Sequence, residues 1–288
     1  MILADGLGHY WSGLRYASKS LSIQEYILTK AFSHWLSMVS NNEPGLPIVS
    51  VYVSEKDIDQ LLQRPPISTK RWKKGKVMFH DGVLRDAKIR IRGDNIRNWG
   101  FFKKSWKVKL KKSQLRSDKI RTYNLVVPRP NLVRELIPYI FARKVGLQVP
   151  SAELVEALLN GEHYGVMLMI EQTDENFLRN SQFMPVNLYK AEPDDQGQLN
   201  GMSYDDLFFG VGAWKQLSKN NNRNNDRSDI RSFIRAGKLG IGVMNSRRES
   251  DSSLEAWAKF SAFQEAMQSW HNSRYVNQRL IIDDYRGL

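Results

Sequence analysis

A glycine-bearing loop with basic residues at both ends is the first part of this sequence that could do chemistry. Arg92-Gly93-Asp94-Asn95 opens the segment, Trp99-Gly100 follows, and Lys103-Lys104 closes it. A glycine loop between two strands can direct backbone N–H groups at a phosphate, while arginine and lysine side chains supply positive charge. The pattern therefore predicts an anion-binding loop. It is not a Walker loop, because no Gly-x-x-x-x-Gly-Lys-Ser/Thr precedes a helix, and an ordinary basic hairpin would share this composition.

The elements that must position this loop are two strands in which apolar and basic residues alternate. Residues 87–92 read Ala-Lys-Ile-Arg-Ile-Arg, and residues 105–110 read Ser-Trp-Lys-Val-Lys-Leu. This period of two predicts half-buried strands on either side of the loop. A further strand is predicted at 77–80, joined to the first of these by the turn Asp81-Gly82.

Turn-forming residues divide the chain. The turn-rich stretch 41–47 separates a predicted helical attachment, residues 1–46, from a main domain at 47–288. The basic segment 70–76 and the asparagine-rich segment 196–227 are predicted to be exposed loops. The other predicted elements are a helix at 56–62, a helix at 132–145 ended by Gly146, a hairpin of 154–159 with 166–170, a strand at 187–190, a helix at 252–269 and a strand at 279–282. This order predicts an α+β protein with two lobes.

The charge predicts a surface that attracts anions. The 288 residues carry a net charge of +13, and 41% of them are hydrophobic, as expected for a folded soluble body. Nucleic acid, anionic lipid, nucleotide phosphates and acidic proteins all fit such a charge. Cysteine is absent and the five histidines lie far apart, so neither a disulfide framework nor a histidine metal site is predicted. No apolar run is long enough to span a bilayer.

The anion-binding loop and the segments after it resemble the CotH (spore-coat protein H) family of atypical protein kinases. The segment from Arg92 to Leu110 is similar to that family's arginine-glycine-asparagine, tryptophan and lysine-lysine-serine signature. The similarity covers roughly residues 47–288. It continues in family order through Arg134, Gly146-Leu147, Pro150, Asn160 to Gly165, Ile170 to Asp174 and Leu188-Tyr189-Lys190.

The resemblance implies a two-lobed kinase-like fold, with an N-terminal antiparallel sheet and a helical C-terminal lobe. It implies binding of ATP with Mg²⁺ or Mn²⁺ and phosphorylation of hydroxyl groups on a protein substrate. Family members are associated with spore coats and cell surfaces, which is compatible with an extracellular location, although no residue here specifies a compartment.

The resemblance also assigns roles to residues. The loop would cover the triphosphate, and Lys103 or Lys104 would neutralise phosphate oxygens. Backbone groups at Glu171 and Gln172 would contact the adenine edge, and Lys190 would reach the same pocket. The cofactor-binding residues implied are Arg92, Gly93, Asn95, Lys103, Lys104, Glu171 and Lys190.

The catalytic position departs from the kinase pattern. In protein kinases a catalytic Asp lies five positions before a metal-binding Asn, a spacing that the resemblance places at Asn272 and Asn277. Asn277 is thus the expected metal ligand. Asn272 cannot accept a proton as a carboxylate does, so either it is not the equivalent residue or activity is weak or lost. His271 is an alternative base, although a histidine beside Trp270 also fits a structural role.

The family's metal-binding aspartate belongs to a Trp-Asp motif, which does not occur before Leu288. We therefore expect a kinase domain that is incomplete at its C-terminus and inactive as this fragment.

Two alternatives remain open on the sequence. The first is a pseudokinase scaffold that binds nucleotide without catalysis, as Asn272 suggests. The second is a nucleic-acid or polyanion-binding module, supported by the charge and by segment 70–76 with Trp72. The second is less favoured, because the basic residues are spread over many elements and no recognition helix, RNP or zinc pattern occurs.

Overall fold

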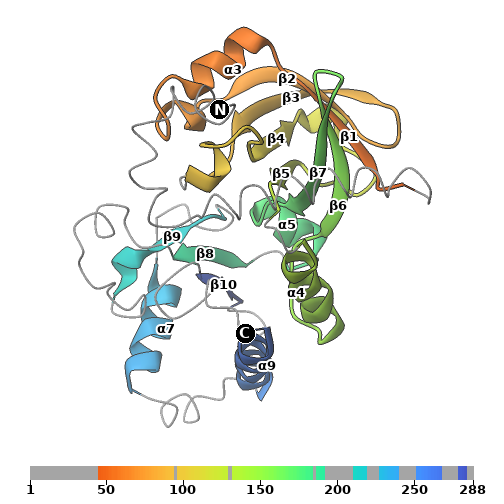
Figure 1. Cartoon of the computed structure of the whole chain (residues 1–288). Coiled ribbons are helices and arrows are strands. Elements are labelled where there is room, and N and C mark those ends of the chain that lie inside the picture. Colours follow the sequence, from red (N-terminus) through yellow and green to blue (C-terminus); the bar gives the residue numbers. More distant parts are fainter. Residues whose placement is uncertain are drawn as a thin grey trace, which may run out of the picture. The chain divides into compact units, whose positions relative to one another are not determined.

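The computed structural model of the chain describes residues 45–93, 96–128, 132–183, 186–191, 210–218, 227–239, 251–267 and 278–283 (Figure 1). The helical attachment expected at 1–46 lies almost wholly outside these residues, and so does the expected catalytic segment 271–277. The chain forms two compact units. Of the described residues, the first unit contains those from 45 to 140 with 150–172, and the second contains 141–149 with those from 173 to 283.

The first unit is built on a closed barrel of seven strands in the order β1-β2-β3-β4-β5-β7-β6. The strands are β1 (Ile48–Tyr52), β2 (Lys73–Met78), β3 (Leu84–Ile91), β4 (Trp106–Leu110), β5 (Thr122–Val126), β6 (Ala152–Leu159) and β7 (Glu162–Glu171). All neighbours are antiparallel except β1 and β6, whose parallel pairing closes the barrel. The α+β class is confirmed, but the expected N-terminal antiparallel sheet is a closed barrel instead. The kinase-like two-lobed arrangement stays a proposal.

Asn160, in the turn between β6 and β7, helps to close the barrel. Its side-chain Oδ1 accepts from Val53 N at 2.9 Å, and its Nδ2 donates to Val53 O at 2.8 Å. Asn160 and Gly161 both have positive φ values, 53° and 88°, as a two-residue turn between antiparallel strands requires. The predicted hairpin is confirmed, and its turn also holds the chain that leaves β1.

Buried and outward-facing side chains alternate along the barrel strands, and the buried ones form the core of the barrel. In β3 and β4 every second residue is buried, namely Arg85, Ala87, Ile89 and Ile91 in β3 and Trp106, Val108 and Leu110 in β4. The intervening basic residues point outward. The predicted exposed loop at 70–76 is wrong in part, because β2 begins at Lys73 and pairs with both β1 and β3.

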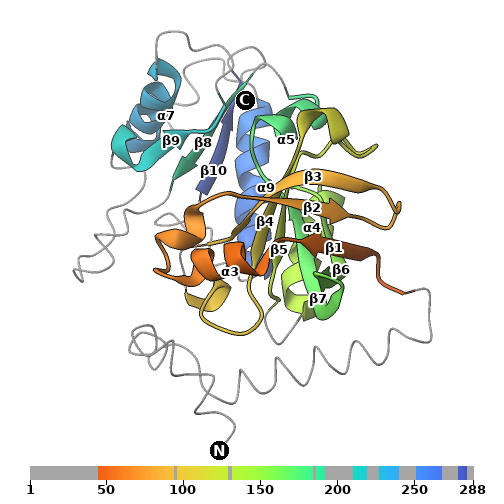
Figure 2. The same ribbon diagram turned by 90° about the horizontal axis from the view of Figure 1, so that it is seen from above.

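Two helices lie between the barrel strands in the sequence. The helix α3 (Glu55–Leu62) begins after Ser54, whose side chain accepts from Asp57 N, and it lies beside β2 in both views (Figures 1 and 2). The Lys73 ammonium bonds the Asp57 carboxylate at 3.0 Å, which ties β2 to α3. The predicted helix at 132–145 is confirmed as α4 (Leu132–Lys144), and Gly146, with a φ of 81°, ends it.

The second unit contains a three-stranded sheet in the order β10-β8-β9. Its elements are α5 (Glu175–Asn180), β8 (Asn187–Ala191), β9 (Trp214–Gln216), α7 (Ser228–Leu239), α9 (Asp251–Met267) and β10 (Gln278–Ile282). The predicted exposed loop at 196–227 is wrong in part, because it contains the strand β9, which pairs with β8 and in which Trp214 is only 2% exposed. None of the helices in the described ranges is long and apolar enough to cross a membrane.

An ion pair in the turn between β2 and β3 should make the unfolding free energy fall as the pH is lowered. Arg85 donates to both carboxylate oxygens of Asp81, at 2.9 and 2.6 Å, and this bonding lowers the Asp81 pKa to about 2. Since the folded-state pKa lies below the usual 3.8, the stability it contributes is present above about pH 4 and is lost toward pH 2. Urea unfolding should show that Asp81→Asn flattens the loss of stability in this window. An unchanged pH profile beside that of the exposed control Asp59→Asn would contradict the prediction.

Candidate functional site

The segment between β3 and β4 folds as a loop closed by its own backbone. Arg92 N donates to Ser105 O at 2.7 Å, and Ser105 N donates to Asn98 O at 2.8 Å. The short helical turn Ile96–Asn98 lies inside the loop, and Gly100 N donates to Ile96 O at 2.6 Å. These N–H groups are therefore used within the loop. Among the described residues, the cationic side chains are the groups most able to meet an anion.

Gly93 is required where the loop leaves β3. Its φ is 84°, and a Cβ at this position would lie 2.3 Å from the Asn98 Nδ2 atom. An L side chain would thus be strained twice, by its backbone conformation and by collision with the Asn98 amide. The absent side chain lets Asn98 pack against the first turn of the loop.

Lys103 places a positive charge where the loop meets the β6–β7 hairpin. Its half-buried ammonium donates to Val166 O at 2.5 Å, and desolvation lowers its pKa to about 8. The Nζ atom lies 3.2 Å from the position that a Cβ on Gly165 would occupy. Lys103 forms no ion pair with a carboxylate of the described residues. Because an ammonium has three N–H donors, Lys103 can bind an anion without giving up Val166.

Lys104 is more deeply buried, with 6% of its surface exposed. Its ammonium donates to the Phe101 carbonyl and lies 3.4 Å from the Phe102 carbonyl. Desolvation lowers its pKa to about 8 as well. Its bonds run back into the loop, so Lys104 fixes the loop's shape while Lys103 is the better placed of the two to contact a ligand.

Tyr164, in β7, holds the end of the loop from the hairpin. Its hydroxyl accepts from Lys104 N at 2.5 Å and lies 3.4 Å from Phe102 O, to which it can donate. Its ring is 6.5 Å from that of Trp106. The sequence resemblance included Tyr164 without giving it a role. The sequence around Tyr164 does not predict its hydrogen bond to Lys104, because the two residues are 60 positions apart.

Removing the Tyr164 hydroxyl should loosen the loop. Tyr164→Phe leaves the Lys104 N–H without its acceptor, which we expect to cost about 1–3 kcal/mol of unfolding free energy. Tyr52→Phe is the matched control, because the Tyr52 hydroxyl makes no hydrogen bond to the described residues. Urea unfolding should show a change below about 0.5 kcal/mol for the control. Equal changes in the two variants would remove Tyr164 from this role.

Arg92 lies half-buried at the start of the loop. Burial lowers the pKa of its guanidinium, while Tyr139 and Glu135, both in α4, act in the opposite direction. The guanidinium stays charged because an arginine is not deprotonated in proteins. Arg92, Gly93, Lys103 and Lys104 all belong to the segment between β3 and β4. Their role in binding a nucleotide stays a prediction.

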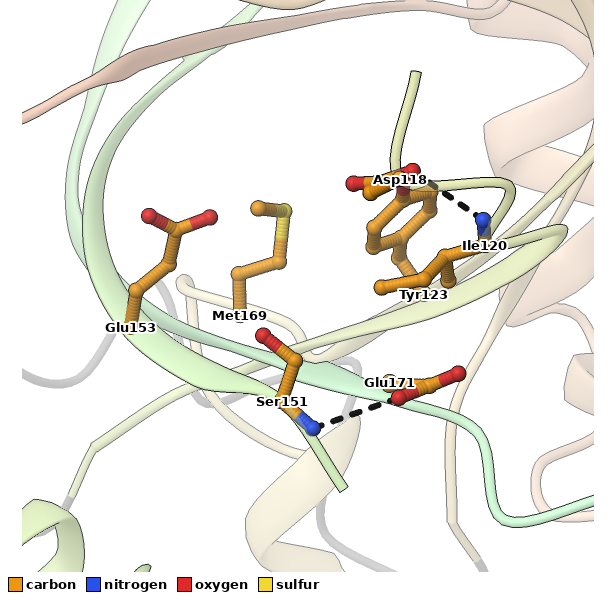
Figure 3. Close-up of a pocket in the computed structure, with 7 residues that line it drawn as sticks. All are labelled: Asp118, Ile120, Tyr123, Ser151, Glu153, Met169 and Glu171. Atoms are coloured by element: carbon orange, nitrogen blue, oxygen red, sulfur yellow. Dashed lines mark hydrogen bonds between the residues drawn. The ribbon is translucent and has the colours of Figure 1, made fainter. Parts of the chain in front are cut away.

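Glu171 lies at the end of β7, away from this loop in the sequence, and its backbone is engaged in the barrel. Glu171 N donates to Ser151 O at 2.8 Å, and Gln172 N donates to Thr122 O at 2.9 Å. The Glu171 carboxylate accepts from Ser151 N at 3.3 Å (Figure 3). Both backbone N–H groups thus already have acceptors. An adenine contact by Glu171 or Gln172 stays a prediction.

The hollow beside Glu171 is small. Its volume is about 10 Å³, and its lining comprises Asp118, Ile120, Tyr123, Ser151, Glu153, Met169 and Glu171 (Figure 3). Such a volume holds about one water molecule. The hollow therefore does not hold an adenine ring.

Of the remaining predicted site residues, one lies in the second unit and the others lie outside the described residues. Lys190 lies in β8 of the second unit, opposite Lys215 and Arg279 in the neighbouring strands. Asn95, His271, Asn272 and Asn277 lie outside the described residues. Within the described ranges, no three acidic or histidine side chains are grouped to hold a metal ion. The expected metal site stays a prediction.

The fold and the loop define an α+β protein with cationic side chains gathered where a barrel loop meets a hairpin. Residues 89–275 match the family model described as CotH kinase protein. The chain belongs to the CotH family.

One curated relative is similar over part of its length. The inner spore coat protein H of Bacillus subtilis (strain 168) is 26% identical over 159 residues. The match covers 54% of this chain and 41% of that protein. The chain thus spans less than half the length of the curated relative that it matches.

Proposed function

We propose that this protein binds ATP and transfers its γ-phosphate to hydroxyl groups of a protein substrate. The observation that carries the proposal is Lys103, a desolvated ammonium with no carboxylate partner among the described residues, next to the loop of a CotH-family chain. A buried cation without a counter-charge is costly unless an anion completes its surroundings. A triphosphate supplies such an anion.

The residues of the loop fit a triphosphate chemically. Lys103 and Arg92 present N–H donors that can bind phosphate oxygens, and such charge-assisted hydrogen bonds are stronger than neutral ones. Phosphoryl transfer depends mainly on positioning and on stabilising negative charge, which cationic side chains provide. Lys104 and Tyr164 would act as positioning residues, because each bonds the backbone of the loop.

A divalent ion, Mg²⁺ or Mn²⁺, would supply further neutralisation of phosphate charge when bound. We propose Asn277 as a ligand on the basis of the family resemblance. The acid–base role belongs by the same resemblance to the region of His271 and Asn272.

A second candidate function is nucleotide binding without phosphate transfer. Position 272 carries Asn where a protein kinase carries the catalytic Asp. An amide does not accept the proton of a substrate hydroxyl at neutral pH. This single observation is the reason to keep a pseudokinase scaffold as the second candidate.

Binding and turnover should be measured separately. Isothermal titration of ATP with Mg²⁺ or Mn²⁺ tests the shared part of both candidates, and transfer of labelled γ-phosphate to a mixed protein substrate tests the kinase alone. Binding with transfer that is lost on adding EDTA supports the kinase. Binding without transfer supports the scaffold, and absence of binding with either metal contradicts both.

A further inference from the structure

The outer face of strands β2, β3 and β4 gathers basic side chains that the sequence spreads over three segments. The strand register places Lys74 opposite Lys88 and Lys88 opposite Lys109. In the next row Arg90 lies opposite Lys107. We call the set of Lys74, Lys76, Lys88, Arg90, Lys107 and Lys109 the basic face. Adjacent strands in a sheet are about 4.8 Å apart, so these cations form short rows across the barrel.

In the described ranges, the exposed lysines of the basic face form no ion pairs. These lysines are Lys74, Lys76 and Lys88, of which Lys76 lies opposite Asp86 in the strand register. Lys73, which points the other way, contrasts with them because it bonds Asp57. Like charges directly opposite one another in a sheet are destabilising. The exposed, directly opposed pair of Lys74 and Lys88 therefore favours an external anion.

An aromatic side chain flanks this face. Trp72, just before β2, is 39% exposed, and the Arg90 guanidinium lies 5.2 Å from the centre of its ring. Cationic rows beside an accessible indole are typical of surfaces that bind single-stranded nucleic acid, where phosphates meet the cations and bases stack on aromatic rings.

The closed barrel argues against an acidic peptide as the partner. Because every strand of the barrel is paired on both sides, a peptide cannot add to it as a further strand. A peptide would be left with exposed charge pairs, which contribute little. A nucleic acid instead carries a charge on every nucleotide and gains by releasing counterions.

We propose that the basic face binds single-stranded nucleic acid, with phosphates along the lysine rows and a base on Trp72. This inference does not rest on the proposed ATP-binding function. It also revises the sequence argument against nucleic-acid binding, since the strand register gathers basic residues that are dispersed along the chain.

The test is fluorescence anisotropy with a labelled short oligothymidylate at about 50 mM salt, where phosphate contacts are strong. The triple variant Lys74→Gln, Lys88→Gln and Lys109→Gln should bind at least about tenfold more weakly. Loss of three phosphate contacts should also reduce the slope of log K against log salt by about 2. Absence of wild-type binding at this salt would overturn the proposal.

A matched triple variant controls for net charge. Lys56→Gln, Lys144→Gln and Lys215→Gln removes the same charge from exposed positions outside the basic face. This control should keep wild-type affinity. Equal weakening in both triple variants would show that binding follows net charge alone, which overturns the proposal.

Trp72 separates nucleic acid from other anions. Trp72→Ala should weaken oligothymidylate binding by about fivefold or more and leave the binding of inorganic polyphosphate, which has no bases, unchanged. Equal losses for the two ligands, or displacement of the oligonucleotide by polyglutamate at equal charge, would contradict a nucleic-acid face. Displacement by ATP with Mg²⁺ at concentrations that saturate the ATP site would place the oligonucleotide there instead, which also contradicts the proposal.

Discussion

Replacing Lys103 with methionine is expected to weaken ATP binding by about tenfold or more while the protein stays folded. The side chain keeps its length and loses an ammonium whose bond to a phosphate oxygen is worth about 1.5–3 kcal/mol. The desolvated charge that disappears was unfavourable in the free protein, since burial lowers the Lys103 pKa to about 8. Stability at pH 7 should therefore be unchanged or raised. Titration calorimetry and urea unfolding measure the two effects.

The control for this variant is Lys111→Met, which removes an exposed lysine with no ion pair in the described ranges. It should change neither ATP affinity nor stability by a measurable amount. If Lys103→Met and Lys111→Met bind ATP equally well, Lys103 does not contact the phosphates.

The lowered pKa of Lys103 gives a dependence on pH with a definite sign. The folded-state pKa near 8 lies below the ordinary value of 10.5. Between these values the unfolded chain binds more protons, so the unfolding free energy of the free protein should rise as pH increases from about 8 to 10.5. Lys103→Met should reduce that rise. Lys104, with a similarly lowered pKa, accounts for the part that remains.

Gly93→Ala is expected to have the second large effect, on the order of 2–4 kcal/mol of unfolding free energy, with loss of ATP affinity. A positive φ costs an L residue about 1–2 kcal/mol, and the new Cβ would lie 2.3 Å from the Asn98 amide nitrogen. Asn98 must then move, and its carbonyl is the acceptor for Ser105 N. The distortion reaches Lys103 and Lys104 through the backbone.

Gly82→Ala separates backbone strain from collision. Gly82 also has a positive φ, 69°, but a Cβ there has no neighbour within 4 Å. We expect a cost of about 1–2 kcal/mol and normal ATP affinity. Thermal unfolding with and without ATP compares the two variants. If both lose the same stability and the same affinity, contact with Asn98 does not shape the loop.

The local elements around the loop could be predicted from the sequence. Alternation at 87–92 and 105–110 identifies β3 and β4, and Asn160-Gly161 identifies the turn of the β6–β7 hairpin. Each of these patterns is local, because it is formed by residues that are close together in the sequence. The segment predicted to bind an anion lies between β3 and β4, and the bond from Arg92 N to Ser105 O joins its two ends.

Features that depend on distant pairing could not be predicted in this way. The strand β5 is buried along most of its length and shows no alternation, and the parallel pairing of β1 with β6 joins segments about a hundred residues apart. The strand β9 contains the buried Trp214, and no local sequence pattern predicted either the strand or the burial. The Tyr164 bond to Lys104 N likewise requires the barrel, because no local pattern relates the two residues.

The most direct test of the proposed function is calorimetric titration of ATP with Mg²⁺ at pH 8.5, in two buffers with different ionisation enthalpies. At this pH part of the Lys103 population is deprotonated, since its pKa is about 8, and a bound phosphate favours the charged form. We predict ATP binding with net proton uptake in the wild-type protein, and weaker binding with less uptake in Lys103→Met. Absence of wild-type binding, or equal affinity and equal proton uptake in both proteins, would contradict a phosphate site at Lys103.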